Sequence, residues 1–278
     1  MLREPSFLAE KASEIRRDVV RMIGLARSGH LASSLSIVDI LVWLYWDVLG
    51  IDPSDPWLES RDRFVLAKGR GAPALYATLA NRNFFERDEL WSYRRLGAML
   101  QGYPQALRIP GVDAPGGGSY GMGLGIANGI ALALRRRQSP FAVFCLAGEE
   151  DVQEGVFWEA VMASSRFASG NVFLIVERNG TKDAEENDPM QTGASLRQRI
   201  LSFGWAAEEC DGHSFISMEK ALSALREDKR RPKCILAGTL LGKGVSFLED
   251  NVAGEENVLD RERVDKALRE LEKGSDLL

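Results

Sequence analysis

Residues 141–165, FAVFCLAGEEDVQEGVFWEAVMASS, contain the pattern on which the rest of the chain is built. A continuously apolar run, 141–147, is followed by a polar loop and then by apolar residues at helical spacing. Apolar runs of this length are typical of strands that are covered on both faces, as in a parallel sheet. The stretch therefore predicts a buried strand, a loop and a helix.

The same pattern recurs along the chain. Three further apolar runs are RFVLA (63–67), NVFLIVE (171–177) and KCILAG (233–238). Helical patterns lie between and around the runs, at 72–82, 87–96, 121–137, 152–168, 194–203 and 216–227. This alternation predicts an α/β fold, doubly wound, with a mainly parallel sheet and helices on both faces. No internal linker stands out, so we expect one domain over 1–278, in which 255–278 form a charged C-terminal helix and tail.

The first fifty residues precede the first predicted strand and are helical in pattern. Residues 8–26 carry an apolar stripe, and a second helix is expected over 37–49. Ser36 is a candidate N-cap for that second helix, with Asp39 reaching back to complete a capping box. Because 37–49 is apolar nearly all round, we expect it to be buried or to lie at a partner interface.

Composition argues against several classes of function. A net charge of −5 at pH 7 gives no general attraction to nucleic acid or to an anionic membrane. No apolar stretch approaches the roughly 20 residues of a membrane span, and we expect no secretory signal. The three cysteines form no Cys-x-x-Cys pair, so we expect them to be reduced and the protein to be cytoplasmic.

Three polar loops adjoin the predicted strands and helices: PGGGSYGMG (115–123), GEEDVQEG (148–155) and ERNGTKD (177–183). In open α/β sheets, ligands bind beyond the carboxyl ends of the strands, near helix N-termini. Glycines in the first loop permit close approach to an anion, although the loop matches neither a Walker sequence nor a dinucleotide fingerprint. The loops predict a site for a cofactor with phosphate groups, and the first loop could also be a flexible turn beside a closely packed helix.

The second loop concentrates carboxylates. Glu149, Glu150, Asp151 and Glu154 lie within six positions, and Asn179 follows the next apolar run, thirty positions after Glu149. Neighbouring parallel strands would bring the two loops together. A carboxylate, an amide oxygen and a backbone carbonyl form the hard oxygen site that Mg²⁺ or Ca²⁺ prefers, with a diphosphate completing the shell. The alternative is a solvated helix start, where the helix dipole favours carboxylates.

These loops resemble the thiamine-diphosphate signature, in which Gly-Asp-Gly is followed by Asn at a similar distance. The chain as a whole is similar to the amino-terminal half of transketolase, in family order over residues 15–251. The resembling segments are SGHLASSLSIVDIL, DRFVLAKGRGAPALYA, LQGYP, IPGVDAPGGGSYGMGLGIANGIALA, GEEDVQEGVFWEA, ERNG, FGW, DGH and LLGKGVSFLEDN.

The resemblance implies cofactors and a partner. In transketolase this half binds the diphosphate, and a pyrimidine-binding domain with the glutamate that activates the cofactor follows in the same chain. Split transketolases made of two subunits exist in the family. The resemblance therefore implies thiamine diphosphate with Mg²⁺ or Ca²⁺, and a separate subunit that supplies the C-terminal half (pyrimidine-binding and C-terminal domains) in an α2β2 assembly.

The resemblance also assigns roles to single residues. His30 and His213 match active-site histidines, and Glu154 matches the glutamate of the family's QEG motif, so these three are the candidate catalytic residues. The candidate metal ligands are Glu149, in place of aspartate, Asn179, and the backbone carbonyl of Thr181. The candidate cofactor-binding residues are Gly118, Tyr120, Gly121, Glu150, Arg70 and Tyr103.

Several of these positions depart from the family pattern. Arg70 and Tyr103 stand in place of histidines, and Leu241 in place of a lysine. Glu150 replaces a glycine, and its carboxylate would repel a diphosphate unless Arg70 or a second cation compensates. A guanidinium pairs with phosphate or carboxylate, so Arg70 could bind either the cofactor or, across an empty site, Glu150 itself.

The resemblance implies transfer of a two-carbon ketol unit (glycolaldehyde or glycolyl) from a ketose donor. Loss of two polar histidines suggests an acceptor other than the ordinary sugar phosphates, such as the thiol of an acyl carrier protein. The alternative is a non-catalytic, transketolase-like scaffold subunit that has lost cofactor binding.

Overall fold

The computed structural model describes residues 2–116, 119–179, 195–249 and 259–275, with side chains described as far as residue 272 in the last range. The chain divides into two compact units. Unit 1 consists of 1–59, 69–116 and 240–278, and unit 2 of 60–68 and 117–239. The single domain expected over 1–278 remains a prediction.

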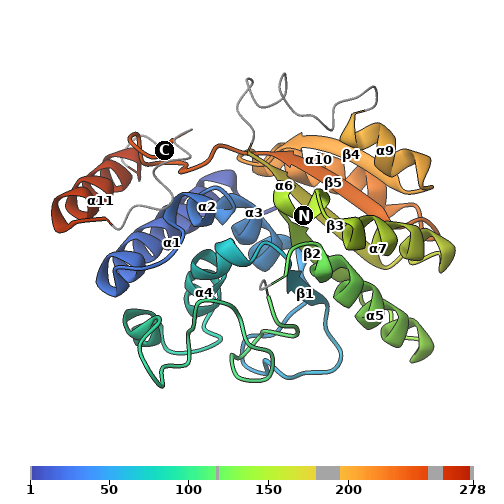
Figure 1. Cartoon of the computed structure of the whole chain (residues 1–278), viewed down its shortest axis with the longest axis horizontal. Helices are drawn as coiled ribbons and strands as arrows, with labels where there is room; N and C mark the ends of the chain where they lie inside the picture. The colour runs from blue at the N-terminus through green and yellow to red at the C-terminus, as the bar shows by residue number, and fades with distance from the viewer. Residues whose placement is uncertain (1, 117–118, 180–194, 250–258, 276–278) are drawn as a thin grey trace. The chain divides into compact units, whose positions relative to one another are not determined.

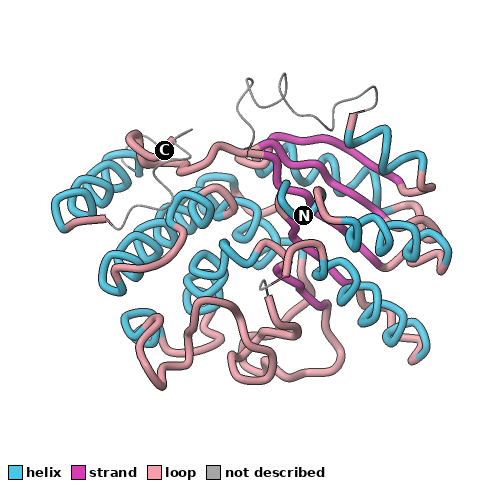
Figure 2. The backbone as a smooth tube through the Cα atoms, in the orientation of Figure 1, coloured by secondary structure: helices cyan, strands magenta, loops and turns pink. Residues whose placement is uncertain are grey.

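Unit 2 is built on a five-stranded parallel sheet (Figures 1 and 2). Its strands, in the order β1-β2-β3-β5-β4, are β1 (Arg63–Leu66), β2 (Val143–Ala147), β3 (Val172–Arg178), β5 (Lys233–Gly238) and β4 (Ala206–Asp211). Four of them lie where continuous apolar runs predict strands, and their residues are almost all buried. The fifth, β4, is not predicted by the sequence, because it is an edge strand whose second half alternates between partly exposed and exposed residues.

The register brings the carboxyl ends of the strands to one side of the sheet, which we call the carboxyl edge. Leu66 pairs with Leu146 and Ala147 with Val176. On the other side, Arg178 pairs with Gly238, which in turn pairs with Asp211. The loops that follow the strands therefore begin at one edge of the sheet, as expected for an open α/β fold.

Helices cover both faces of this sheet. On one face lie α5 (Met122–Arg136), α7 (Gly155–Arg166) and α9 (Leu196–Ser202). Asn128 of α5 donates to the carbonyl of Ala160 in α7, and the Trp158 ring of α7 lies 5.7 Å from the ring of Phe203, which ends α9. The helix α10 (Phe215–Arg226) connects β4 back to β5 and lies behind the strands in Figure 1, as a right-handed crossover requires. The doubly wound fold is thus confirmed.

The helix predicted over 152–168 is divided. A short helix, α6 (Glu149–Val152), follows β2 directly, and α7 begins at Gly155. Glu154 is the extended residue between the two helices. The acidic loop is therefore mostly helical turn rather than open loop.

Unit 1 is helical. It contains α1 (Pro5–Ala26), α2 (Leu31–Leu35), α3 (Val38–Trp43), the π-helix η1 (Leu44–Val48), α4 (Ala72–Asn81), the 3-10 turns η2 (Gly69–Gly71) and η3 (Arg87–Ser92), and α11 (Arg261–Ser275). The helix expected over 87–96 is only the short 3-10 turn η3: the backbone is already extended at Tyr93 (ψ 130°), and Arg94 then takes a left-handed conformation (φ 59°) that a helix cannot continue through. The predicted helix 37–49 is buried, in the form of α3 and η1.

Two details of unit 1 differ from expectation or bear on it. The capping box of Ser36 and Asp39 is wrong: Asp39 instead binds Arg16 at 2.6 Å, because a buried guanidinium needs a counter-charge, and Ser36 donates to the Ser33 carbonyl. The segment Leu31–Val48 is long and apolar enough to pass for a membrane span, yet 94% of it is buried in the structure, as in the core helices of many folded proteins. In unit 2, the three cysteines (Cys145, Cys210 and Cys234) form no disulfide.

Candidate functional site

The acidic turn at the end of β2 is tied to the glycine loop by Asp151, a residue to which the sequence motifs assign no role. Asp151 is 1% exposed, and its two carboxylate oxygens accept the backbone N–H of Gly121 at 2.7 Å and of Gly148 at 2.9 Å. Burial raises the pKa of Asp151, and these two hydrogen bonds oppose that rise. Asp151 therefore joins the loop before α5 to the loop after β2.

Glu149 lies beside the end of β3, as predicted from its spacing to Asn179. The β2 and β3 strands are neighbours, and Asn179 is the half-buried residue that follows β3 directly. Oε1 of Glu149 lies 3.6 Å from Nε of Arg178, the last residue of β3. The structure therefore brings the Glu149 and Asn179 positions to adjacent strand ends, while Thr181 and Gly118 fall outside the described residues.

The charge balance at this edge fits a hard cation. Burial raises the pKa of Glu149, and the carboxylates of Glu177 and Glu150 raise it further, while Arg178 lowers it. A carboxylate in these surroundings is stabilised by an added positive charge. Within the described residues, no group of three His, Cys, Asp or Glu side chains could hold a metal ion alone, so the ligand set would need Asn179 and oxygens from a bound ligand.

A buried ion pair that the sequence motifs do not predict lies at the same edge. Nζ of Lys68, two residues beyond β1, lies 2.7 Å from Oε2 of Glu177, and the two side chains are 3% and 1% exposed. The hydroxyl of Thr239, which follows β5, donates to the other Glu177 oxygen at 2.8 Å. One feature of the sequence could have pointed to this pair: Lys68 and Glu177 each stand at the end of a strongly apolar run, where a charged side chain is buried only if it is paired.

The glycine loop combines close packing with an accessible start to α5. Gly121, the N-cap of α5, has φ 77°, a conformation that favours glycine. A Cβ on Gly123 would lie 2.3 Å from Cβ of Ala67, so α5 packs directly against the chain leaving β1. Tyr120 and Met122, on either side of Gly121, are 40% and 45% exposed. The expected alternative of close helix packing is thus present, together with an exposed helix N-terminus.

The other unit 2 candidates lie at different distances from Glu149. Glu154 is exposed and precedes α7, and its backbone N–H donates to the Asp151 carbonyl at 3.2 Å. His213 follows the edge strand β4, and its backbone N–H donates to Oδ1 of Asp211 at 2.8 Å. Because β5 lies between β4 and β3, the His213 backbone is two strand spacings, about 10 Å, from the end of β3. Glu154 therefore adjoins the acidic turn, and His213 stands farther along the edge.

In unit 1 the structure brings two predicted residues together. His30 precedes α2, and Arg70 lies in η2. The hydroxyl of Ser34 in α2 donates to the backbone carbonyls of His30 at 2.6 Å and of Arg70 at 3.2 Å. This shared partner fixes the two backbone segments side by side.

Arg94 connects the His30 segment with the Tyr103 segment. Its guanidinium donates to the hydroxyl of Ser28, and a Cβ on Gly102 would lie 3.0 Å from its Nη2. Tyr103 itself is 46% exposed. Arg94 is thus a residue of this region that carries no motif of its own, and the sequence offered no signal for it.

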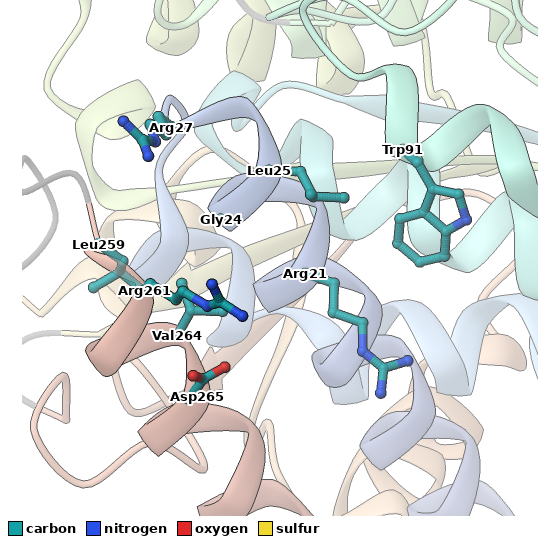
Figure 3. Close-up of a pocket in the computed structure, with 9 residues that line it drawn as sticks. All are labelled: Arg21, Gly24, Leu25, Arg27, Trp91, Leu259, Arg261, Val264 and Asp265. Carbon is teal, nitrogen blue, oxygen red and sulfur yellow. The ribbon is translucent and has the colours of Figure 1, made fainter.

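Unit 1 also contains a pocket of about 650 Å³ (Figure 3). It is lined by Arg21, Gly24, Leu25, Arg27, Trp91, Leu259, Arg261, Val264 and Asp265. The residues placed around it include none of the predicted site residues. Its three arginines are exposed, which is the usual state of arginine at a surface, so the pocket by itself indicates no ligand.

Comparison with known proteins agrees with this arrangement. The family model described as "Transketolase, thiamine diphosphate binding domain" matches residues 8–272. The 6-deoxy-6-sulfo-D-fructose transketolase subunit SqwG of Clostridium sp. (strain MSTE9) is 33% identical over 269 residues, which cover 96% of both chains. One subunit of the apulose-4-phosphate transketolase of Phocaeicola vulgatus is 28% identical, over 92% of this chain and 90% of the relative.

Undivided transketolases are matched over part of their length. Human transketolase is 30% identical over 95% of this chain and 42% of its own. The crystal structure of transketolase from Campylobacter jejuni superposes with a TM-score of 0.88 at 25% identity, over 99% of this chain and 46% of that one. The chain therefore spans slightly less than half of these enzymes, and it belongs to the transketolase family, in which it corresponds to the thiamine diphosphate-binding domain.

Proposed function

We propose that this chain is the cofactor-binding subunit of a two-subunit, transketolase-like transferase that moves a two-carbon ketol unit from a ketose donor. The observation that carries the proposal is the joint placement of Glu149 and Asn179 at the neighbouring ends of β2 and β3. Family membership and two relatives named as transketolase subunits support it.

In this proposal two strand ends of unit 2 hold the metal ion, and the start of α5 receives the diphosphate. Glu149 and Asn179 hold a divalent cation, Mg²⁺ or Ca²⁺, whose remaining ligands include the diphosphate and the Thr181 carbonyl. The N-terminal turn of α5, with Tyr120, Gly121 and Gly118 before it, faces the diphosphate, because a helix N-terminus attracts anions. Thiamine diphosphate, when bound, supplies the electron sink for breaking the donor carbon–carbon bond.

The remaining assignments follow the family resemblance. His30, His213 and Glu154 orient donor oxygens or carry protons, and Arg70 and Tyr103 contact the cofactor or the donor. The partner chain supplies the C-terminal half, with the glutamate that activates the cofactor, in an α2β2 assembly. We further propose an acceptor other than a sugar phosphate, with a carrier-protein thiol as the candidate, because two polar positions of the family are altered.

The test is a binding and turnover measurement on the complex. The chain is purified with a protein from the same genome that resembles the C-terminal half of transketolase, and is titrated calorimetrically with thiamine diphosphate and Mg²⁺. We expect binding that Glu149→Ala weakens by about tenfold or more, as losses at metal sites commonly do. Glu159→Ala, an exposed glutamate on α7, is the matched control. An intact complex that binds no cofactor at millimolar concentration would refute the proposal and favour a scaffold role.

A further inference from the structure

The Lys68–Glu177 ion pair crosses a strand. Lys68 leaves the end of β1, Glu177 belongs to β3, and β2 lies between these strands in the sheet. The Lys68 side chain therefore passes the carboxyl end of β2 to reach its partner, at the point where the acidic turn begins. We call Lys68, Glu177 and Thr239 the Lys68 bridge.

Gly148 is the residue over which the bridge passes. A Cβ at this position would lie 3.3 Å from both Cγ and Cδ of Lys68 and 2.9 Å from Oε2 of Glu150. The Gly148 backbone is extended (φ −104°, ψ 178°), a conformation open to any residue. A side chain at this position would therefore press on the Lys68 stem and on the Glu150 carboxylate, whereas the backbone angle by itself would accept any residue.

The bridge also holds the far side of the edge. Oε1 of Glu177 accepts the Thr239 hydroxyl at 2.8 Å, and the Thr239 backbone N–H donates to the Arg178 carbonyl at 2.8 Å. Asn179 follows Glu177 by two residues, so the bridge anchors the backbone just before Asn179. Three strand ends, those of β1, β3 and β5, are linked beneath the turn that follows β2.

A buried ion pair adds little net stability, because the cost of desolvating both charges offsets most of their attraction. Its geometric effect is larger, since each partner is held in one position by the other. Here the positions that it sets are those of Gly148, from which the acidic turn starts, and of the backbone before Asn179.

We propose that Lys68 is a positioning residue: held by Glu177 and Thr239, it sets the spacing between the Glu149 turn and Asn179. The inference rests on the proposed function, because the spacing matters only if these two positions share a ligand. Lys68 itself needs no contact with that ligand. The proposal makes one prediction for the chain without cofactor and one for the complex with it.

The first experiment tests the crossing without any cofactor. Gly148→Ala is introduced into the wild-type chain and into the variant Lys68→Ala/Glu177→Gln, which leaves no unpaired buried charge. We expect the melting temperature to fall by about 2–10 °C in the wild type, as overpacking in a chain of this size does. In the double variant, which lacks the Lys68 stem but keeps the contact with Glu150, the fall should be smaller. An equal fall in both backgrounds would show that the Lys68 stem does not set the position of Gly148, and would refute the positioning role.

The second experiment measures cofactor binding by the complex with its partner chain. Lys68→Ala/Glu177→Gln should raise the Kd for thiamine diphosphate in Mg²⁺ about tenfold or more, the size of effect seen when supporting residues of a metal site are lost. The single variant Lys68→Arg, which keeps a positive charge that can extend to Glu177, should keep most of the wild-type affinity. Lys233→Met, a change in another buried lysine at the opposite end of the sheet, should leave the Kd unchanged.

The outcomes separate the two proposals. If the wild-type complex binds no cofactor, the proposed function fails and the positioning role fails with it. If the wild type binds and the double variant binds equally well, the proposed function stands and the positioning role is refuted. A Kd that rises equally in the Lys233 control would show that the loss of any buried lysine weakens binding, wherever it lies in the sheet, which also refutes positioning.

Discussion

Lys233 offers a test of how burial sets the stability of unit 2. It is the first residue of β5 and is 1% exposed. Its ammonium group donates to the Gly170 carbonyl and lies 4.9 Å from the centre of the Phe173 ring. Burial is the main cause that lowers the pKa of Lys233 from 10.5 to about 8.

The sign of the pH effect follows from this lowered pKa. Between pH 8 and 10.5 the unfolded chain binds a proton at this lysine more readily than the folded chain, so stability rises with pH through that window. The difference between the two pKa values corresponds to about 3 kcal/mol, at about 1.4 kcal/mol per pH unit. Below pH 8 the fold carries this whole penalty.

Lys233→Met removes the penalty and also the hydrogen bond to Gly170, which is worth about 1 kcal/mol. We therefore expect the variant to be about 2 kcal/mol more stable than the wild type at pH 7. Above pH 10.5 it should be less stable by about 1 kcal/mol, since only the lost hydrogen bond remains.

The assay is urea unfolding at pH 7, 8, 9 and 10, with the free energy of unfolding compared between the two proteins at each pH. Lys220→Met, at an exposed lysine on α10, is the control and should show no such trend. A difference between wild type and Lys233→Met that stays constant from pH 7 to pH 10 would refute the reasoning.

Three further predictions concern packing and buried charge. Gly123→Ala should destabilise the chain by about 2 kcal/mol or more in thermal unfolding, because its Cβ would lie 2.3 Å from Cβ and 2.8 Å from Cα of Ala67. Ala67→Gly in the same chain removes only the first of these contacts and should restore only part of the loss. Asp18→Ala should cost about 2 kcal/mol, because this buried carboxylate accepts hydrogen bonds from Arg87 and Asn81, while the half-exposed Arg87 can be solvated by water after the change; equal melting temperatures would contradict it. Asp151→Ala leaves two loop amides without their acceptor and should cost at least about 2 kcal/mol and weaken cofactor binding, whereas Glu159→Ala should do neither.

Sequence patterns were most informative where burial is complete. The strands β1, β2, β3 and β5 could be predicted because strands covered on both faces have to be continuously apolar. The edge strand β4 has no such requirement, so its mixed sequence AAEECD carried no strand signal. The break between α6 and α7 could not be predicted either, because the apolar residues keep helical spacing from the acidic turn into α7.

For the site, the sequence alone determined which chemistry is available and where along the chain it lies. The acidic turn, Asn179 and the family resemblance all follow from residues at short or regular spacing, which one strand-loop-helix unit dictates. Only the tertiary structure decided which side chains are joined. Lys68 and Glu177 are 109 positions apart, and Asp151 binds Gly121 thirty positions away. Such pairs depend on the order in which the strands lie in the sheet, and neither helical nor strand periodicity specifies that order.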